Sequence, residues 1–246
     1  MIIDTHTHIN EGIYSTGEYL SVLDTYSVSK VWISSVGGIT AHGKYRESNE
    51  FLYRFCKGHE DRLIGFCSVN PNCGMEVIDE LKKCKEVYGF FGLKLHPWLQ
   101  GFPVPSRIMD LITEECIRNG MPMIFHDGTP PYSSTLQIAN LAERYPDAII
   151  ILGHSGLIEM YDDAISAARR LKNIYLSVCG PSICQLQKIV SSVPDDRVMF
   201  GSDFGFSKSI NGLKYRLDMW NYVDMEESLR NKLFYLNAEA LMGGLK

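Results

Sequence analysis

Eight short apolar segments recur along the 246-residue chain, and their regular return restricts the fold more than any other feature. Near-continuous apolar runs of this length are typical of strands that are buried on both faces of a parallel sheet. These segments cover residues 1–4, 30–36, 62–69, 89–95, 121–126, 148–154, 173–178 and 197–203. Stretches with helical spacing separate them, for example at residues 18–26, 49–57, 75–88, 106–119, 135–145 and 162–171.

This alternation predicts an α/β fold built on a parallel sheet. Eight strand–helix units in a chain of about 250 residues favour a closed (β/α)8 TIM barrel, which we expect to form one domain over residues 1–246. An open, doubly wound sheet is the alternative, but no glycine-rich phosphate loop follows the first segment. Residues 203–225 are expected to form a long loop over the site, and the tail that follows is expected to form one or two closing helices.

The composition fits a globular protein and disfavours some functions. The formal net charge is −5, and no run of lysine or arginine suggests a nucleic-acid or membrane partner. The seven cysteines are odd in number and form no CxxC pair, so reduced thiols in a cytoplasmic protein are expected. Neither a signal peptide nor an apolar run of about 20 residues is visible.

The histidines point to the site. Five of the seven fall at or just past the C-terminal end of a predicted strand, where TIM barrels build their active sites. Asp4 and Asp203 fall beside them. Buried imidazoles and carboxylates are unfavourable unless they are paired or bind a metal, so packing alone does not explain this gathering. The five histidines are His6, His8, His96, His126 and His154.

The opening DTHTH gives the sharpest signal, because alternate residues of a strand share one face and would place Asp4, His6 and His8 together. Alone, an HxH pair divides evenly between metal ligands and loop histidines. Together with FHDG, LGHSG and GSDF it indicates a metal site. Asp203 is interpreted as a ligand and proton acceptor rather than a helix cap. Asp4 is either a group that orients an imidazole or a simple buried carboxylate.

The motif GLKLHP places Lys94 and His96 on one face where the fourth strand ends. Lys94 could carry a carbamate that bridges two metals, form a salt bridge to Asp203 or Asp4, or contact an anionic substrate. His96 is a candidate substrate ligand, with Trp98 as an apolar wall. His42 and Arg46 follow the second strand and either reach the substrate or are solvated. The thiols after the seventh strand, Cys179 and Cys184, are interpreted as core or loop residues.

The motifs DTHTH, GLKLHP, FHDG, LGHSG, GSDF and NAEALM span the whole chain and resemble the amidohydrolase superfamily. The resemblance is strongest to its amidohydrolase-related branch of metal-dependent decarboxylases, hydratases and hydrolases. TatD-like nucleases resemble the chain less, because they place a glutamate where Lys94 stands. Phosphoesterases of the polymerase-and-histidinol-phosphatase type carry a further histidine near the final aspartate, which GSDFGF lacks.

The resemblance implies a distorted (β/α)8 barrel that holds one or two divalent ions, commonly zinc. By matching position, it implies that His6, His8, His126 and Asp203 bind the principal metal. His154 would bind a second metal or act on the substrate or the catalytic water. Lys94 matches the position of the bridging carbamate in binuclear members.

The leading prediction is therefore a metal-dependent hydrolase that uses metal-activated water on a C–N or C–O bond of a small amide, lactone or ester. Asp203 would accept the proton of that water, and His154 would stabilise the developing charge. The alternative is a lyase, a decarboxylase or hydratase acting on a small carboxylic acid. A cation aimed at the metal from the rim loops would favour the lyase, with Arg46 and Lys208 as candidates.

A metal- or ligand-binding protein without turnover is the third interpretation, although no ligand position appears lost. The expected partner is a small-molecule substrate, with no nucleic acid and no membrane. The sequence leaves a homodimer open.

Overall fold

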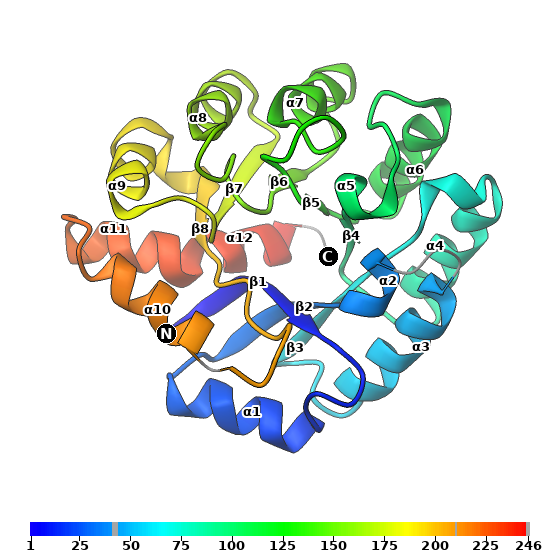
Figure 1. Cartoon of the computed structure of the whole chain (residues 1–246), viewed down its shortest axis with the longest axis horizontal. Coiled ribbons are helices and arrows are strands. Elements are labelled where there is room, and N and C mark those ends of the chain that lie inside the picture. The colour runs from blue at the N-terminus through cyan, green and yellow to red at the C-terminus, as the bar shows by residue number, and fades with distance from the viewer. Residues whose placement is uncertain (41–43, 210, 245–246) are drawn as a thin grey trace.

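Eight parallel strands pair in sequence order in the computed structural model, which describes residues 1–40, 44–209 and 211–244 (Figure 1). They are β1 (Ile3–Ile9), β2 (Lys30–Ser35), β3 (Leu63–Cys67), β4 (Gly92–Leu95), β5 (Met123–Phe125), β6 (Ile150–Leu152), β7 (Ile174–Val178) and β8 (Val198–Phe200). The sheet returns to its first strand through a parallel bridge between Thr7 and Phe204. The predicted TIM barrel is thus confirmed.

Helices surround the barrel at the places where helical spacing predicts them. They are α1 (Thr16–Thr25), α3 (Tyr45–Cys56), α4 (Glu76–Glu86), α6 (Arg107–Arg118), α7 (Thr135–Arg144) and α8 (Tyr161–Arg170), followed by α9 (Ile183–Ser192). Each presents an apolar stripe to the strands; in α6, for example, Met109, Ile112 and Cys116 are buried at helical spacing. Short helices lie in the loops after β2 and β4, namely α2 (Val36–Thr40) and α5 (Pro97–Gln100), and 3-10 turns form η1 (Pro71–Cys73) and η2 (Asp195–Arg197).

The long loop predicted over residues 203–225 is wrong in its second half, where helix α10 (Asn211–Trp220) forms. Leu213 and Trp220 are buried, and Leu217 packs against the same core cluster. This i, i+4, i+7 spacing is the pattern of an amphipathic helix. The tail forms closing helices as predicted: α11 (Glu227–Asn231), the π-helix η3 (Lys232–Leu236) and α12 (Asn237–Gly244).

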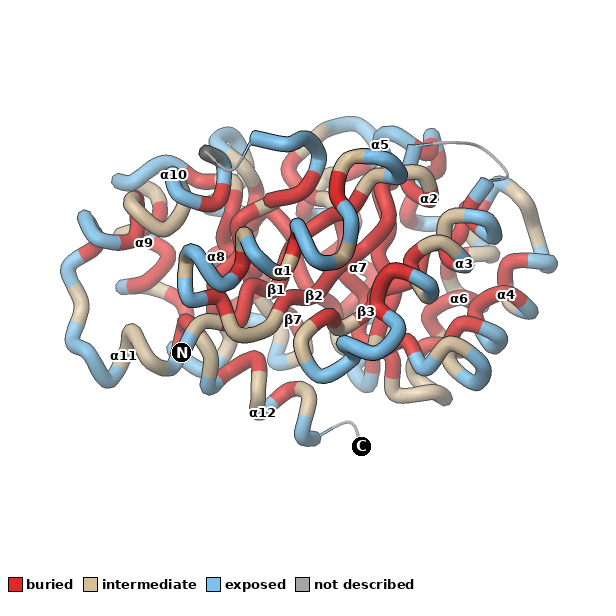
Figure 2. Tube along the Cα trace, turned by 90° about the horizontal axis from the view of Figure 1, so that it is seen from below, coloured by how far each residue is buried: buried red, intermediate tan, exposed pale blue. Residues whose placement is uncertain are grey.

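The two ends of the barrel differ in chemistry. Near the N-terminal end of the strands, Ile3, Trp32 and Phe66 pack with further apolar side chains of β5, β6 and β8. Ala238 and Leu241 of α12 join this cluster and close that end. Figure 2 shows α12 below the barrel, and α5 and α10 on the opposite side. None of the helices in the described ranges is both long and apolar enough to cross a bilayer.

Candidate metal centre

The inward-facing side chains change from apolar to polar along the strands. In β2, Trp32 belongs to the apolar cluster, whereas Ser34, two residues further on, bonds to the ring of His8. In β8, Met199 is apolar, and the same alternation leads beyond the strand to Asp203. Polar groups therefore gather at the C-terminal mouth, the end at which TIM barrels carry their active sites.

Strand β1 runs to Ile9, five residues beyond the predicted end, so His6 and His8 lie within it. Its register against β2 shifts between Asp4 and Thr7, which indicates an extra residue in β1. A bulge interrupts strand alternation, so the expectation that Asp4 shares one face with both histidines is not met. Asp4 instead accepts hydrogen bonds from the N–H groups of His6 (3.2 Å) and Ser202 (3.0 Å).

Asp203 stands opposite these histidines. Its Oδ1 lies 3.1 Å from His8 Nε2 and 3.8 Å from His6 Nε2. The backbone of Asp203 adopts a φ of +61°, a left-handed conformation that is uncommon for a residue other than glycine. Two backbone bonds to β1 hold it there: Asp203 N–H donates to His6 O (2.9 Å), and His8 N–H donates to Phe204 O (2.6 Å).

These three donors fit a divalent cation. Although 34% of the Asp203 side chain is exposed, its Oδ1 is buried and has no hydrogen-bond partner within the described structure. The Nδ1 atom of His6 lies 2.7 Å from the carbonyl of Gly153, which only accepts, so Nδ1 carries the proton and Nε2 keeps its lone pair. A cation between His6, His8 and Asp203 would satisfy the unpaired oxygen and both Nε2 atoms.

The charges of these groups also suit a cation. Burial lowers the pKa of His6 and His8, which keeps both imidazoles in the neutral form that binds metals. Burial alone would raise the pKa of Asp203, but His154, His8 and Lys94 outweigh it and hold the pKa of this carboxyl below its usual range. The site therefore combines two neutral nitrogens with one carboxylate.

Lys94 reaches this cluster from β4. Its side chain is buried, and Nζ lies 2.8 Å from His6 Nε2. Burial lowers the pKa of its ammonium to about 8. Within the described residues it forms no ion pair with Asp203 or Asp4, so the predicted salt bridge is absent there. The carbamate and the substrate contact stay predictions.

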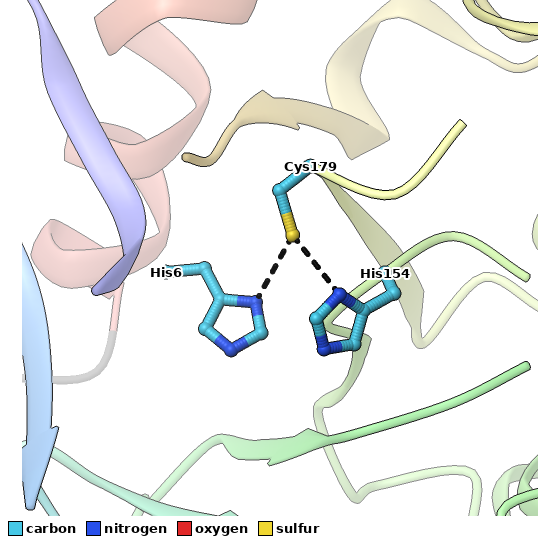
Figure 3. Close-up of side chains that lie close together, drawn as sticks. All are labelled: His6, His154 and Cys179. Atoms are coloured by element: carbon cyan, nitrogen blue, oxygen red, sulfur yellow. Dashed lines mark hydrogen bonds between the residues drawn. The ribbon is translucent and has the colours of Figure 1, made fainter. Parts of the chain in front are cut away.

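Cys179 lies between His6 and His154, and its sulfur contacts both rings (Figure 3). Its Sγ lies 3.2 Å from His154 Nδ1, 3.5 Å from His6 Nδ1 and 3.0 Å from the carbonyl of Gly153. A thiol that donates to this carbonyl can accept from His154 Nδ1, which leaves His154 Nε2 without a proton. The sequence places this thiol at the rim after the seventh strand but indicates only a core or loop residue. Its contact with two histidine rings is visible only in the folded chain.

His126 and His96 form an adjoining pair whose rings stack with centroids 3.7 Å apart. The ring centroid of His126 also lies 4.2 Å from that of His154. The Nε2 atom of His126 forms a hydrogen bond with Thr129 Oγ1 (3.0 Å). It does not join His6, His8 and Asp203 in one tight group of donors, so its role as a metal ligand stays a prediction.

Two aromatic side chains border the mouth. Trp98 in α5 is 49% exposed, and its ring centroid lies 6.5 Å from that of His96. Phe206, after β8, is 41% exposed and lies 4.4 Å from the ring of His8. Trp98 is therefore placed as an apolar wall would be, and Phe206 is a second such residue that the sequence did not single out.

The two cations proposed for substrate contact are already paired. Arg46 forms ion pairs with Glu76 (3.4 Å) and Glu80 (4.0 Å) of the neighbouring helix α4. Lys208 lies 3.7 Å from Glu18 of α1. A role for either residue in binding substrate stays a prediction. His42 lies outside the described residues.

Asp127, which the sequence did not single out, holds the loop that carries His154. Its carboxylate accepts hydrogen bonds from the N–H groups of His154 (2.7 Å) and Gly156 (2.6 Å). Burial raises the pKa of Asp127 to about 6. Asp4 holds the β8 end in the same manner, and burial raises its pKa to about 7. Both act on backbone N–H groups rather than on an imidazole ring.

Comparisons with known proteins identify the family. The chain matches the amidohydrolase family over residues 3–244 and belongs to that family. No curated protein matches it. Three similar solved structures share 15–18% identity with it, which supports the fold alone.

The first of these is 2,6-dihydroxybenzoate decarboxylase from Rhizobium, with 16% identity, 98% of each chain covered and a TM-score of 0.77. The second is 5-carboxyvanillate decarboxylase from Novosphingobium aromaticivorans, solved with manganese, with 15% identity, 99% of this chain and 96% of that chain covered and a TM-score of 0.76. The third is 4-oxalomesaconate hydratase from Rhodopseudomonas palustris, with 18% identity, 100% and 96% covered and a TM-score of 0.71.

Proposed function

We propose that this chain is a metal-dependent lyase that decarboxylates or hydrates a small carboxylic acid. The observation that carries the proposal is the unpartnered Asp203 oxygen beside the Nε2 atoms of His6 and His8, a donor set suited to one divalent cation. The lyase, rather than the hydrolase that the sequence favours, gains support from the decarboxylases and the hydratase among the similar structures.

A bound divalent cation supplies a Lewis acid that polarises a substrate oxygen and balances its negative charge. The rest of the chemistry belongs to side chains. A lyase must move a proton to or from a substrate carbon, and Asp203 is the candidate because its carboxylate is ionised and borders the mouth. His154 is neutral, and Cys179 holds its Nδ1, so Nε2 is the atom at which it would take up a proton.

A hydrolase is the second candidate, and Lys94 is the observation that favours it. Its Nζ lies 2.8 Å from His6 Nε2, so a carboxylated Lys94 would add oxygen donors next to a candidate metal ligand. If these donors held a second ion, the two ions would favour attack by activated water on an amide, lactone or ester.

The test combines metal counting with product analysis. The purified chain would first be stripped of bound metal with a chelator and then reloaded with Mn²⁺ or Zn²⁺. Mass spectrometry would give the number of ions per chain. It would then be incubated in D₂O with panels of small carboxylic acids, amides, lactones and esters, and the products followed by NMR. We expect one ion per chain, turnover of a carboxylic acid, and deuterium at the carbon that gains the proton.

Two variants make the result specific. Asp203→Asn should abolish turnover, whereas His59→Gln, at an exposed position before β3, should leave it unchanged. Turnover of only amides, lactones or esters, with two ions and a carboxylated lysine, would establish the hydrolase instead. Tight metal binding without turnover of any panel member would exclude both enzymes.

A further inference from the structure

If the proposed function holds, the substrate carries a carboxylate, and a permanent cation near the mouth would help to bind it. Lys94 is buried among the metal ligands and has a lowered pKa, so its charge is not permanent. Arg46 and Lys208 are neutralised by carboxylates of α4 and α1. The structure offers another cation on α10, a helix that the sequence did not predict.

Arg216 extends from α10 toward the loop after β7. Its Nη1 lies 3.5 Å from the carbonyl of Pro181 and 3.3 Å from the sulfur of Met219. Pro181 is two residues beyond Cys179, the thiol that contacts the rings of His6 and His154. The side chain is therefore anchored beside the segment that supports the candidate metal centre.

The charge of Arg216 is unmatched. The residue is half-buried, and none of the described carboxylates lies within 4.0 Å of its guanidinium. It has three partners: the carbonyl oxygen of Pro181, the thioether of Met219 and the ring of Tyr215, whose centroid lies 5.4 Å from the guanidinium carbon. Both hydrogen bonds use Nη1, so other N–H donors of the fork stay free. A partly desolvated guanidinium with free donors favours an anion, and its planar fork matches a carboxylate.

Electrostatics around Cys179 agree with this position. Burial raises the pKa of the Cys179 thiol and Asp203 raises it further, whereas Arg216 is the foremost group that lowers it, ahead of Lys94. Helix α10, which carries Arg216, also lies on the mouth side of the barrel, opposite α12 (Figure 2).

We propose that Arg216 binds the substrate carboxylate at the β7–β8 side of the metal centre and so selects carboxylic acids. The substrate would then be held by the cation site through one oxygen function and by Arg216 through its carboxylate. This assignment rests on the proposed function but concerns binding, so it can be tested separately from turnover.

The test measures binding of benzoate and its neutral isostere benzamide to the Mn²⁺-loaded full chain by calorimetry. Arg216→Gln should weaken benzoate binding by about 10-fold or more and leave benzamide unchanged, because a charge-assisted bond is lost. Arg216→Lys keeps the charge without the fork and should give an intermediate loss. Lys214→Gln is the matched control, since it removes a charge from the same helix at an exposed residue paired with Asp218.

Equal affinity of the wild type for benzoate and benzamide would overturn the proposal, as would equal losses in Arg216→Gln and Lys214→Gln. Added salt should weaken benzoate binding to the wild type and have little effect on Arg216→Gln. Arg216-dependent binding without turnover of any carboxylic acid would reject the proposed function and keep this assignment. Turnover of a carboxylic acid that is unchanged in Arg216→Gln would support the proposed function and reject this assignment.

Discussion

At the scale of single residues, the proposed metal site depends on which nitrogen of each imidazole is free to bind a cation. His6 is fixed by the carbonyl of Gly153, and His8 by Ser34, whose Oγ lies 3.0 Å from its Nδ1. Such partners hold the ring and its tautomer and strengthen the nitrogen that binds the metal. The hydroxyl of Ser34 should therefore contribute to metal affinity without touching the metal.

Ser34→Ala should lower the affinity for Mn²⁺ by about 10- to 100-fold, because His8 loses the partner that orients its ring. Titration calorimetry of the stripped protein measures this change. Ser35→Ala is the control, since Ser35 is also buried in β2 and has no side-chain hydrogen bond to either histidine. Equal affinities of the two variants would show that Ser34 does not support His8.

At the scale of elements, the contact between β1 and the end of β8 brings Asp203 to the histidines. Gly205 allows this contact: its φ is +110°, and a Cβ there would lie 1.8 Å from the carbonyl oxygen of His8. Any side chain at residue 205 would therefore push the two segments apart.

Gly205→Ala should weaken Mn²⁺ binding by at least 10-fold and destabilise the fold by about 1–3 kcal/mol, through strain and the clash with β1. Gly12→Ala separates the two causes, because Gly12 has a φ of +79° but open space around its Cβ position. The control should lose some stability and keep its metal affinity, as measured by urea unfolding and calorimetry. Unchanged metal affinity in Gly205→Ala would mean that the β1–β8 contact does not position Asp203.

Helix α12 acts at the other end of the barrel. Leu241 packs with Ile3, Trp32 and Phe66 over the N-terminal ends of the strands, far along the barrel from the polar mouth. Leu241→Ala should lower the free energy of unfolding by about 2–5 kcal/mol, because it leaves a cavity in this cluster. Leu236→Ala changes a residue that is 42% exposed and should lower the free energy of unfolding much less.

Urea unfolding measures the free energy of unfolding of both leucine variants, and titration with Mn²⁺ measures their metal affinity. The Mn²⁺ affinity of folded Leu241→Ala should equal that of the wild type, since the cluster and the metal centre occupy opposite ends of the strands. A loss of metal affinity together with stability would show that the two ends are coupled.

At the scale of the whole molecule, the apolar core cluster and the candidate site lie at opposite ends of the barrel. Apolar side chains fill one end, while the mouth gathers buried imidazoles, carboxylates and Lys94. Buried polar groups without full partners reduce stability, so a ligand that satisfies them should stabilise the fold. The protein should therefore be less stable without metal.

Saturating Mn²⁺ at about 100 times its Kd should raise the free energy of unfolding by about 2.7 kcal/mol, and thus the Tm by roughly 5–10 °C. A chelator should reverse the shift in a thermal melt. Asp203→Asn should show little or no shift because a charged ligand is missing. An equal shift in wild type and variant would place the cation elsewhere in the molecule.

The sequence by itself determined the barrel and the side chains that gather at its mouth. Apolar runs at regular spacing favour buried parallel strands, and a polar residue near the C-terminal end of such a strand lies at the mouth. His6, His8, Lys94 and Asp203 could be placed there on that ground, and their roles stay predictions. Helix α10 also had a readable signal in the spacing of its buried residues, although the prediction missed it.

Only the tertiary structure decided which atoms meet. The bulge in β1 depends on pairing with β2, so strand alternation could not reveal that Asp4 bonds to the β8 end rather than joining the histidines on one face. The contact of Cys179 with His6 joins residues far apart in sequence. The pairing of Arg46 with Glu76 likewise depends on how α3 packs against α4. Local patterns record which face a residue occupies, but contacts between distant segments arise only when the barrel closes.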